Sequence, residues 1–478
     1  MNKRAKKTKV IATLGPASST KEIMLELVKA GADVFRINFS HADYELVKRN
    51  VDIIREINQE YGYNISILGD LQGPKLRVGV VKEGSFLNPG DVLTFTNEPC
   101  EGDSTKVFMT YEKFPQDVKV GERILIDDGK LVFEVIDTNQ KDTVKAKTIQ
   151  GGPLSSKKGV NLPNTNVSLP ALTEKDIEDA KFMIENEFDW IALSFVRHAQ
   201  DIIDLKKLIE AHSDFKIPII AKIEKPEGVK NIDEILLECD GLMVARGDLG
   251  VEVPMEEVPV IQKKLVDKAR YYSKPVIIAT QMMETMISSL TPTRAEVNDV
   301  ANNVLDGADA VMLSGETSVG KYPVDVVKNI TKIIKNIEST NLYEKKNDII
   351  EKITCVDDRF VTDMVCLNAV KIAETTGAAA IITLTHSGYT AFQISAHRPT
   401  SRIIVYSSNR RVLTMLNLLW GVRAFYYDMN KSTDETVIQV NMLTHHYGYV
   451  EKGDFVVNLN AMPVYEGGKT NTLRLTNI

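Results

Sequence analysis

Residues 218–248, PIIAKIEKPEGVKNIDEILLECDGLMVARGD, decide the fold class of this chain. Two short apolar runs, PIIAKIEK (218–225) and GLMVARGD (241–248), flank the amphipathic stretch VKNIDEILLE (229–238). Each run is rich in small and branched apolar residues and ends in charged ones, which is typical of a strand buried on both faces. The segment therefore predicts two parallel strands that are connected by a helix.

Six further runs of the same kind occur along the chain, with amphipathic stretches between them. They are KVIATLGP (9–16), VFRINFS (34–40), ISILGDLQGP (65–74), WIALSFV (190–196), PVIIATQMME (275–284) and AVMLSGE (310–316). Eight alternations of strand and helix predict an α/β fold with a closed (β/α)8 TIM barrel rather than an open sheet. In such a barrel the chemistry lies at the C-terminal ends of the strands.

The first helix is predicted from STKEIMLELVKAG (19–31). Ser19 followed by Glu22 has the spacing of a capping box, and Gly31 is the expected C-terminal stop. We therefore expect a helix that begins just after Ser19.

The length of 478 residues corresponds to about three domains of roughly 150 residues. About a hundred residues separate ISILGDLQGP from the next predicted helix, and they contain short alternating segments such as VLTFT (92–96). Because a structureless loop of that length is implausible, this region predicts an inserted small β-barrel lid domain of antiparallel strands. The predicted parts are the barrel (1–72 and 170–341), the lid (73–169) and a C-terminal open α/β regulatory domain (342–478).

The composition excludes several classes of protein. With 58 basic and 65 acidic residues the net charge is −7, which gives no reason to expect nucleic-acid binding. No apolar run reaches the roughly 18 residues of a membrane span, and the apolar part of the N-terminus is too short for a secretion signal. No C-x-x-C pair occurs, so neither a zinc ribbon nor a disulfide framework is indicated, and we expect a cytoplasmic location. The cysteines are Cys100, Cys239, Cys355 and Cys366.

Polar side chains follow the predicted strands. Lys222 and Glu224 are two residues apart, so their side chains face the same space, and Asp248 follows the next strand. Two carboxylates from neighbouring strands suit a hard divalent cation, and a lysine beside them can stabilise charge on a transferring group. The alternative is a structural ion pair between Lys222 and one of the carboxylates. Other strand ends carry Arg36, Asn38, Asp70, Arg246, Thr280 and Glu316.

Basic residues are predicted to converge on the same rim. Arg36 enters from the second strand, and Lys75, Arg77, Lys157 and Lys158 lie where the insertion leaves and rejoins the barrel. This arrangement indicates an anionic, phosphorylated substrate, although each residue taken alone is more simply a solvated surface base. No Walker A and no kinase-type Gly-rich motif is present, so the residues alone define a metal-dependent barrel enzyme that acts on an anion.

Eight motifs, in their order along the chain, resemble the pyruvate kinase family. They are KVIATLGPAS, FRINFSHA, LGDLQGPKLRVG, GVNLP, IAKIEKPEG, MVARGDLG, ATQMMETM and LSGETSVGKYP. The resemblance covers the whole chain, including the insertion and the C-terminal stretch EGGKTNTLRL. Members of this family make pyruvate and ATP from phosphoenolpyruvate and ADP.

The resemblance implies the following catalytic and substrate-binding roles. Lys222 stabilises the phosphoryl group during transfer, and Arg36 contacts the phosphate. Glu224 and Asp248 bind the divalent metal, Mg2+ or Mn2+. The backbone near Gly247 and the hydroxyl of Thr280 contact the substrate, and Thr280 is linked to the proton relay. The residues implied on the nucleotide side are Arg77, Lys157, Asn38 and His41.

The resemblance also bears on monovalent cations. Many members require K+, held by residues that match Asn38, Ser40, Asp70 and the backbone at Leu71, and those members carry Glu at the position of Lys75. An ammonium group at Lys75 can supply the charge that the cation brings. We therefore expect activity without K+.

The C-terminal domain contains TLTHSGYTAFQISAHRP (383–399). This loop resembles the one that binds sugar-phosphate effectors in some relatives, while other relatives respond to AMP. The alternative is a helix cap without a ligand. Relatives are usually homotetramers, so a homotetramer is expected here as well. The loop residues are Thr385, Ser387, Gly388 and Thr390.

Two other functions remain open from the sequence. One is a metal-dependent, pyruvate-forming lyase or aldolase on the same barrel, which would not need ADP. The other is a non-catalytic metabolite-binding relative, which would be expected to lack one of Lys222, Glu224 and Asp248.

Overall fold

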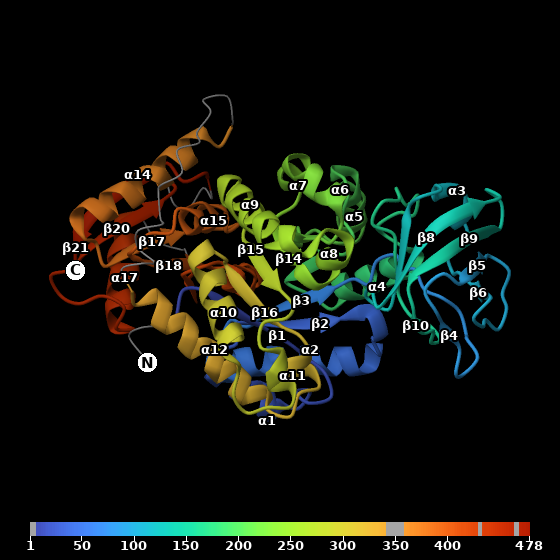
Figure 1. The fold of residues 1–478 in the computed structure, drawn as a ribbon. Coiled ribbons are helices and arrows are strands. Elements are labelled where there is room, and N and C mark those ends of the chain that lie inside the picture. Colours follow the sequence, from blue (N-terminus) through green and yellow to red (C-terminus); the bar gives the residue numbers. More distant parts are fainter. Residues whose placement is uncertain (1–5, 341–357, 429–432, 463–467) are drawn as a thin grey trace.

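The computed structural model describes residues 6–340, 358–428, 433–462 and 468–478 (Figure 1). At its centre, eight parallel strands form a closed barrel in the order β1-β16-β15-β14-β13-β12-β3-β2. All eight predicted strands are present, and the (β/α)8 barrel is confirmed. The strands are β1 (Lys9–Thr13), β2 (Val34–Asn38), β3 (Ser66–Asp70), β12 (Trp190–Leu193), β13 (Ile219–Ile223), β14 (Gly241–Ala245), β15 (Val276–Ala279) and β16 (Ala310–Leu313).

Helices surround the barrel and separate its strands along the chain (Figure 1). The stretch after β13 is split into two short helices, α6 and α7. The helices of the barrel are α1 (Lys21–Ala30), α2 (Tyr44–Tyr61), α4 (Glu174–Glu185), α5 (Ala199–His212), α6 (Pro226–Lys230), α7 (Ile232–Glu238), α8 (Arg246–Glu252), α9 (Val258–Tyr271), α10 (Arg294–Asp306), α11 (Gly315–Ser318) and α12 (Pro323–Glu338), with short 3-10 helices η1 (Phe39–His41), η2 (Met255–Glu257) and η3 (Glu284–Ile287).

The start of α1 differs from the prediction by one residue. Thr20, not Ser19, is the N-cap, and its side chain accepts a hydrogen bond from Ile23 N. Ser19 instead donates its hydroxyl to the carbonyl of Gly15 at 2.8 Å, so it stabilises the loop before the helix. The predicted end is confirmed, because Gly31 caps the helix with φ +123°.

The insertion forms a sheet-rich domain beside the barrel mouth, drawn in cyan in Figure 1. Six strands form one sheet in the order β11-β7-β8-β9-β5-β6, and β4 pairs with β10. The pairs are antiparallel as predicted, except that β5 and β6 are parallel. Isolated bridges join Arg77 to Gly159 and Val78 to Met109. Residues 77–78 therefore lie between β11 and β6, the two outer strands of this sheet. The elements are β4 (Phe86–Leu87), β5 (Val92–Thr96), β6 (Lys106–Phe108), α3 (Phe114–Asp117), β7 (Arg123–Ile126), β8 (Leu131–Thr138), β9 (Thr143–Gln150), β10 (Gly152–Pro153) and β11 (Val160–Asn161).

The C-terminal domain is an open α/β sheet in the order β19-β18-β17-β20-β21. Its strands are parallel except β21, which pairs antiparallel with β20 and was not predicted from the sequence. The elements are α14 (Phe360–Thr376), β17 (Ala380–Leu384), α15 (Tyr389–Ala396), β18 (Arg402–Ser407), α16 (Arg410–Met415), η4 (Leu416–Leu418), β19 (Val422–Tyr426), α17 (Thr433–His446), β20 (Phe455–Asn460) and β21 (Thr472–Asn477).

Four aspartates stabilise the N-terminal rim of the barrel in the same way. Each immediately precedes a strand, and its carboxylate accepts the N–H of a residue at the start of the neighbouring strand, at 2.7–3.0 Å. In every second pair of neighbouring strands, this hydrogen bond satisfies a backbone N–H at the point where the backbone hydrogen bonds between the two strands begin. The pairs are Asp33 with Val10, Asp189 with Ile67, Asp240 with Ile219 and Asp309 with Val276.

The C-terminal domain binds to this same rim. Arg398 forms a bidentate ion pair with Asp309 at 2.7 and 2.9 Å, and both side chains are buried. Thr414 donates its hydroxyl to Asp189, and Asn417 donates to the carbonyl of Asp33 at 2.7 Å. These polar contacts orient the domain at the end of the barrel opposite the expected active site.

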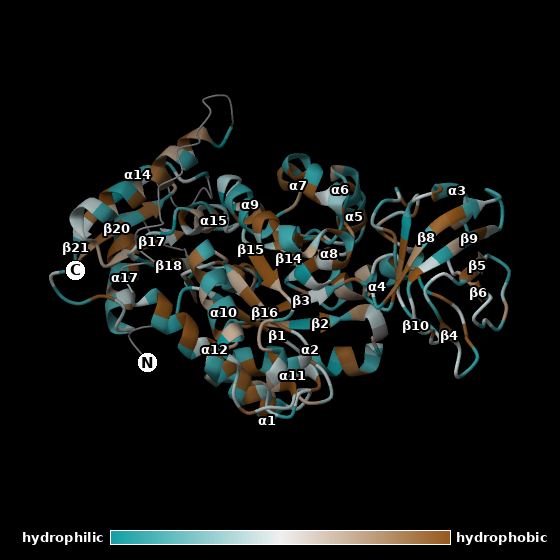
Figure 2. Cartoon of the chain, in the orientation of Figure 1, coloured by the Kyte–Doolittle hydropathy of each residue, from teal (hydrophilic) through white to brown (hydrophobic). Residues whose placement is uncertain are grey.

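The apolar core divides into unequal parts. One cluster of buried side chains runs from the barrel strands into the C-terminal domain and includes Trp190 and Trp420, whereas the insertion has a cluster of its own. The C-terminal domain also has a smaller cluster of its own, which includes Tyr406. Figure 2 shows the hydrophobic residues concentrated on the barrel strands. The insertion therefore has a core separate from that of the barrel, as expected of a distinct domain.

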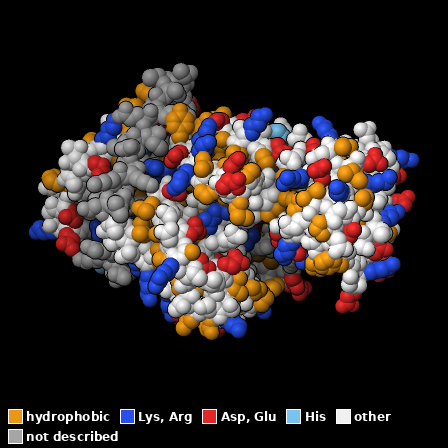
Figure 3. All heavy atoms as spheres, in the orientation of Figure 1, with side chains coloured by type: hydrophobic (Ala, Val, Ile, Leu, Met, Phe, Trp, Pro, Cys, Tyr) orange, Lys and Arg blue, Asp and Glu red, His pale blue; other side chains and the backbone are white. Residues whose placement is uncertain are grey.

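On the face shown in Figure 3, basic and acidic side chains are interspersed over the barrel and the lid. Within the described residues, no helix is long and apolar enough to cross a membrane. Cys100, Cys239 and Cys366 are free thiols, and Cys355 lies outside the described residues.

His397, at the end of α15, makes the stability of the fold depend on pH. Burial lowers the pKa of His397 to about 4, and the positive charges of Arg270 and Lys371 act in the same direction. The unfolded histidine, with a pKa of about 6.5, binds a proton that the folded one excludes. The stability that the neutral ring contributes is present above pH 6.5 and is lost as the pH falls towards 4.

We expect the chain to lose about 1–2 kcal/mol of unfolding free energy through His397 between pH 7 and pH 5. Urea unfolding of wild type and H397N at both pH values measures this loss, and H397N should lose less than wild type. H212N, which changes an exposed histidine in α5, is the control. The same pH dependence in wild type and H397N would contradict the prediction.

Candidate active site

Lys222 is the centre of the polar cluster at the C-terminal rim of the barrel. Its ammonium group donates to Asp70 Oδ1 at 3.0 Å and to Ser194 Oγ at 2.6 Å, and it lies 3.1 Å from Glu224 Oε1. The ends of β3, β12 and β13 supply these groups, and these strands are neighbours in the barrel. The predicted proximity of Lys222 and Glu224 is therefore found, and Asp70 and Ser194 extend it.

Arg36 reaches the same carboxylate from β2. Its Nε donates to Asp70 Oδ2 at 2.7 Å, and Nη2 lies 2.6 Å from the same oxygen. Nη1 donates to the hydroxyl of Thr13 on β1 at 3.1 Å. Asp70, whose side chain is only 1% exposed, is therefore the common acceptor for two cations that both face the rim.

The charges of this cluster control its titration. Burial alone would lower the pKa of Lys222, but Asp70 and Glu224 outweigh it and hold the pKa above its ordinary value. Burial alone would raise the pKa of Asp70, but Lys222 and Arg36 hold it below its ordinary value. Lys222 is thus kept charged at neutral pH.

Glu224 and Asp248 have the character of a metal site. Burial, opposed by Lys222 and assisted by Asp248, raises the pKa of Glu224 to about 7, so this carboxylate lacks sufficient positive charge around it. Glu224 Oε2 accepts the N–H of Phe195 at 2.7 Å, while Asp248 is exposed to the cavity. No cluster of three or more metal-ligating side chains occurs among the described residues. Two carboxylates with room for water and substrate oxygens fit Mg2+ or Mn2+.

The backbone around Thr280 is unusual. Thr280 has φ +70° and Gln281 has φ +54°, a conformation that is uncommon for a β-branched residue. The Thr280 hydroxyl accepts the N–H of Gly247 at 2.8 Å and donates to the carbonyl of Ala279 at 2.6 Å. Thr280 therefore orients the Gly247–Asp248 turn, and its hydroxyl proton is bonded to backbone in this structure.

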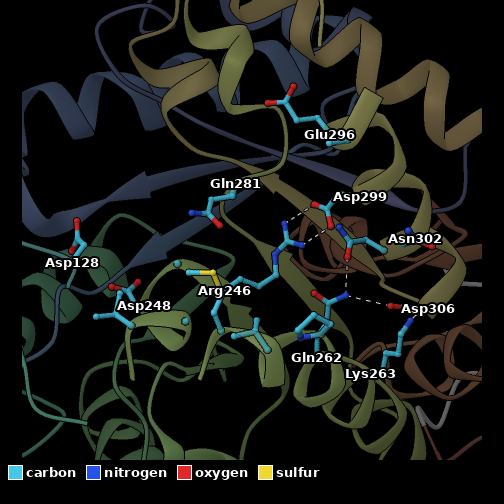
Figure 4. A pocket seen from close by; sticks show the side chains of 18 of the residues that line it. Asp128, Arg246, Asp248, Gln262, Lys263, Gln281, Glu296, Asp299, Asn302 and Asp306 are labelled. Carbon is cyan, nitrogen blue, oxygen red and sulfur yellow. Dashed lines mark hydrogen bonds and ion pairs between the residues drawn. The ribbon is translucent and has the colours of Figure 1, made fainter. Parts of the chain in front are cut away.

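Arg246 is a residue whose contribution the sequence did not predict. Its guanidinium donates to the carbonyl of Thr280 at 2.7 Å and forms a bidentate pair with Asp299 of α10, with both bonds at 2.8 Å (Figure 4). It thus holds the strained Thr280 in place from the helix side. The motif ARGDLG drew attention to Arg246, but its partner is 53 residues away and carries no local signal.

A cavity of about 270 Å³ lies between the barrel rim and the lid. Asp248 lines it from the barrel, and Lys75, Arg77 and Lys157 line it from the lid side, as predicted. The lid is joined to the barrel at Gly73, which has φ +70° and whose Cβ would lie 2.8 Å from the ring of Phe195, so glycine is required there.

The residues predicted for the monovalent-cation position are only partly brought together. Asn38 pairs in register with Asp70, and its Oδ1 accepts the N–H of Ser40 at 3.1 Å. The carbonyl of Leu71 accepts the hydroxyl of Ser194 at 2.7 Å. Lys75 is exposed and lines the cavity. The side chain of His41 lies outside the described part of the structure.

Asp248 also lines a larger cavity, of about 1150 Å³ (Figure 4). It is lined by Arg246, Gly247 and Asp248 at one end and continues between α9 and α10 to Asp306. Asp128 of the lid borders it as well. Asp248 therefore faces both cavities.

The predicted effector loop lines a separate cavity of about 220 Å³ in the C-terminal domain. Gly388 N donates to the Thr385 hydroxyl at 2.9 Å, and the hydroxyls of Thr390 and Thr470 are 2.8 Å apart. Arg359 and Lys469 also line this cavity, so two basic groups face the hydroxyl-rich loop; Ser387 lies on the same wall.

A closed (β/α)8 barrel with a cationic, carboxylate-rich rim under a lid is the architecture of an enzyme that acts on an anionic substrate. The family descriptions "Pyruvate kinase, barrel domain" and "Pyruvate kinase, alpha/beta domain" match residues 5–327 and 363–476. The chain belongs to the pyruvate kinase family, whose members are phosphotransferases.

Full-length relatives support this assignment. The chain is 43% identical over 457 residues to pyruvate kinase 2 of Synechocystis, covering 95% of this chain and 76% of that protein. It is 41% identical to pyruvate kinase of Mycobacterium intracellulare, covering 99% of both chains. A solved pyruvate kinase from Cryptosporidium parvum superposes with a TM-score of 0.93 at 33% identity, covering 99% of this chain and 97% of that one.

The double contact of Asp70 yields a first prediction for the site. D70N removes the negative charge that holds Lys222 and Arg36, so both cations reorient, and kcat for phosphoryl transfer should fall by about 10²–10³-fold. Steady-state kinetics with folded protein, checked by circular dichroism, measures the change. D52N, on the exposed face of α2, is the matched control. Unchanged kcat in D70N would show that the cations do not depend on Asp70.

Proposed function

We propose that this chain transfers the phosphoryl group of phosphoenolpyruvate to ADP at the Lys222 centre, forming pyruvate and ATP. The observation that carries the proposal is the convergence of Lys222 and Arg36 on buried Asp70, next to Glu224. In this cluster two basic side chains face three carboxylates when Asp248 is included. The net charge of the cluster is therefore negative. A bound divalent cation would make it positive, which suits a highly charged phosphate.

Phosphoryl transfer requires positioning and charge stabilisation more than covalent help from the protein. An oxygen of the ADP β-phosphate bonds to phosphorus, the bond from phosphorus to the enol oxygen breaks, and its electron pair remains on the enolate of pyruvate. We assign to Lys222 and Arg36 the stabilisation of the charge that is spread over the transferring group. Glu224 and Asp248 would hold Mg2+ or Mn2+, which supplies positive charge beside the phosphate and enolate oxygens.

Protonation of the enolate carbon completes the reaction. Thr280 accepts the N–H of Gly247 through its hydroxyl, and we propose that this hydroxyl contacts the substrate. For its hydroxyl to take part in proton delivery, the hydrogen bond that it donates to the carbonyl of Ala279, with the two oxygens 2.6 Å apart, has to break. Arg246 is proposed to keep Thr280 in the required backbone conformation through this step.

On the lid side, we propose that Arg77 and Lys157 bind the phosphates of the nucleotide, with Asn38 and His41 on the same side. This proposal is supported by the position of Arg77 and Lys157 on the cavity that Asp248 also lines. Lys75, exposed on that cavity, is proposed to replace K+ at the position of Asn38, Ser40, Asp70 and Leu71.

We also propose an effector site, a cellular location, an oligomeric state and the domain borders of this chain. The loop with Thr385, Ser387, Gly388 and Thr390 binds a sugar-phosphate or AMP effector, supported by the basic groups on its cavity. The protein is a cytoplasmic homotetramer. The lid spans 73–169 between barrel segments 1–72 and 170–341, and the C-terminal domain spans 342–478. The glycine turn at Gly73 supports the first border, while the border at 341/342 lies outside the described residues.

The proposed function is tested by pyruvate formation from phosphoenolpyruvate with Mg2+ in the presence and absence of ADP. We expect turnover that requires ADP and is abolished by EDTA, and a loss of about 10³-fold in kcat for K222M. K328M, on an exposed face of α12, should behave as wild type. Pyruvate formation without ADP would favour the lyase, and binding without turnover would favour the non-catalytic relative.

The role of Lys75 predicts equal kcat with and without K+, at constant ionic strength. K75E removes the ammonium and adds a carboxylate, so its activity should fall at least tenfold in K+-free buffer and recover when K+ is added. K82E, on the outer surface of the lid, should show no such dependence. Wild-type activity that requires K+ would disprove the role of Lys75 while leaving the enzymatic function intact.

A further inference from the structure

A buried polar contact joins the lid to the barrel, in addition to the two chain segments that connect them. The Lys225 ammonium lies 2.8 Å from Glu252 Oε1, and the Asn161 side-chain amide donates to the same oxygen at 2.8 Å. Lys225 also approaches the carbonyl of Leu162 at 3.5 Å. The side chains of Lys225 and Glu252 are 10% and 1% exposed. Asn161 and Leu162 belong to the lid, whereas Lys225 and Glu252 belong to the barrel.

The barrel side of this contact is a continuation of the active site. Glu252 is the last residue of α8, and the same seven-residue helix contains Gly247 and Asp248 in its first turn. Lys225 directly follows Glu224, after β13. A movement of the lid that displaces Glu252 would therefore also displace α8, the short helix that carries the proposed metal ligand Asp248.

The lid side continues to the nucleotide-binding residues. Asn161 ends β11, which pairs with β7 through Val160 with Ile126 and Asn161 with Leu125. Lys157 lies four residues earlier in the same segment, and its N–H donates to the carbonyl of Gly79 at 2.9 Å. The position of Asn161 against Glu252 thus sets how far Lys157 stands from Asp248 across the cavity.

This contact is separate from the bonds that hold the two segments by which the lid is connected to the barrel. Arg197 of the barrel donates through its guanidinium to the carbonyls of Val167 and Leu169, where the lid chain returns to the barrel. Asp176 accepts the N–H of Gly73, where the chain leaves it, at 3.1 Å. These bonds hold the two ends of the lid, whereas the Asn161 bond joins its sheet to the barrel at a third point.

We propose that Lys225 and Glu252 are positioning residues that hold the lid, through Asn161, in the orientation in which its cations face Asp248. The inference rests on the proposed function, because it concerns the same cavity. Lys225 neutralises Glu252 inside the barrel, and the shared oxygen retains capacity to accept the Asn161 amide. A hydrogen bond to a carboxylate in a buried place is stronger than a neutral one, so a single bond suffices to bias the lid.

The test uses N161A, E252Q and the double variant in the full-length chain. N161A should raise the KM for ADP about tenfold and leave the KM for phosphoenolpyruvate and kcat at saturation within about twofold. It should also increase hydrogen exchange of the backbone amides in residues 157–162, while the barrel strands keep their protection. E252Q removes the negative charge of the group that accepts the Asn161 hydrogen bond. Adding it to N161A should therefore have little further effect on the KM for ADP.

E238Q, which changes an ion pair of equal length (Lys206 with Glu238, 2.8 Å) on the outside of the barrel, is the matched control. The proposal is overturned if N161A leaves both the KM for ADP and the exchange unchanged. It is also overturned if the effects of N161A and E252Q are additive, because Asn161 would then act directly on the nucleotide. Failure of the proposed function is recognised separately, since the wild-type chain would then form no pyruvate from phosphoenolpyruvate and ADP.

Discussion

The active site depends on one buried carboxylate, that of Asp70. Lys222 and Arg36 carry like charges and both face the rim, so without a shared anion between them they would repel each other. Asp70 offsets this repulsion by accepting hydrogen bonds from both cations. Four neighbouring strands contribute one group each to this arrangement, namely Arg36 from β2, Asp70 from β3, Ser194 after β12 and Lys222 from β13. Closure of the barrel is what brings these four strand ends into one arc.

The two ends of the barrel use the same residue type for different purposes. At the C-terminal rim, Asp70 orients the two cations of the proposed catalytic cluster. At the N-terminal rim, aspartates that precede alternate strands cap neighbouring backbone N–H groups, and Asp309 and Asp189 also accept hydrogen bonds from the C-terminal domain. The C-terminal domain has an apolar cluster of its own but also contributes to the core of the barrel, whereas the core of the lid is separate and the lid contacts the barrel through a few polar side chains. Stability and access to the site are therefore provided by different ends of the same barrel.

Agreement between sequence and structure is close for the barrel and weaker for short elements. The eight strands follow from runs that are apolar on both faces, and the long helices follow from their amphipathic period. The helix start was placed one residue early, because Ser19 and Thr20 are both good caps and the choice depends on the Gly15 carbonyl in the folded loop. Strand β21 was missed because its polar sequence becomes a strand only by pairing with β20, and the parallel pair of β5 and β6 depends on the path of the lid chain.

By itself, the sequence determined the alternating fold, the inserted lid and the set of chemically capable residues, because periodicity and residue type are local properties. It placed Lys222 and Glu224 on one side of a strand, and the structure finds them 3.1 Å apart. Only the tertiary structure decided which partners these residues have. Asp70 meets Lys222 across 152 residues, Arg246 meets Asp299 across 53, and Asn161 meets Glu252 across 91. Such pairs depend on strand order, on register and on the position of the lid, and no local pattern of residues encodes these.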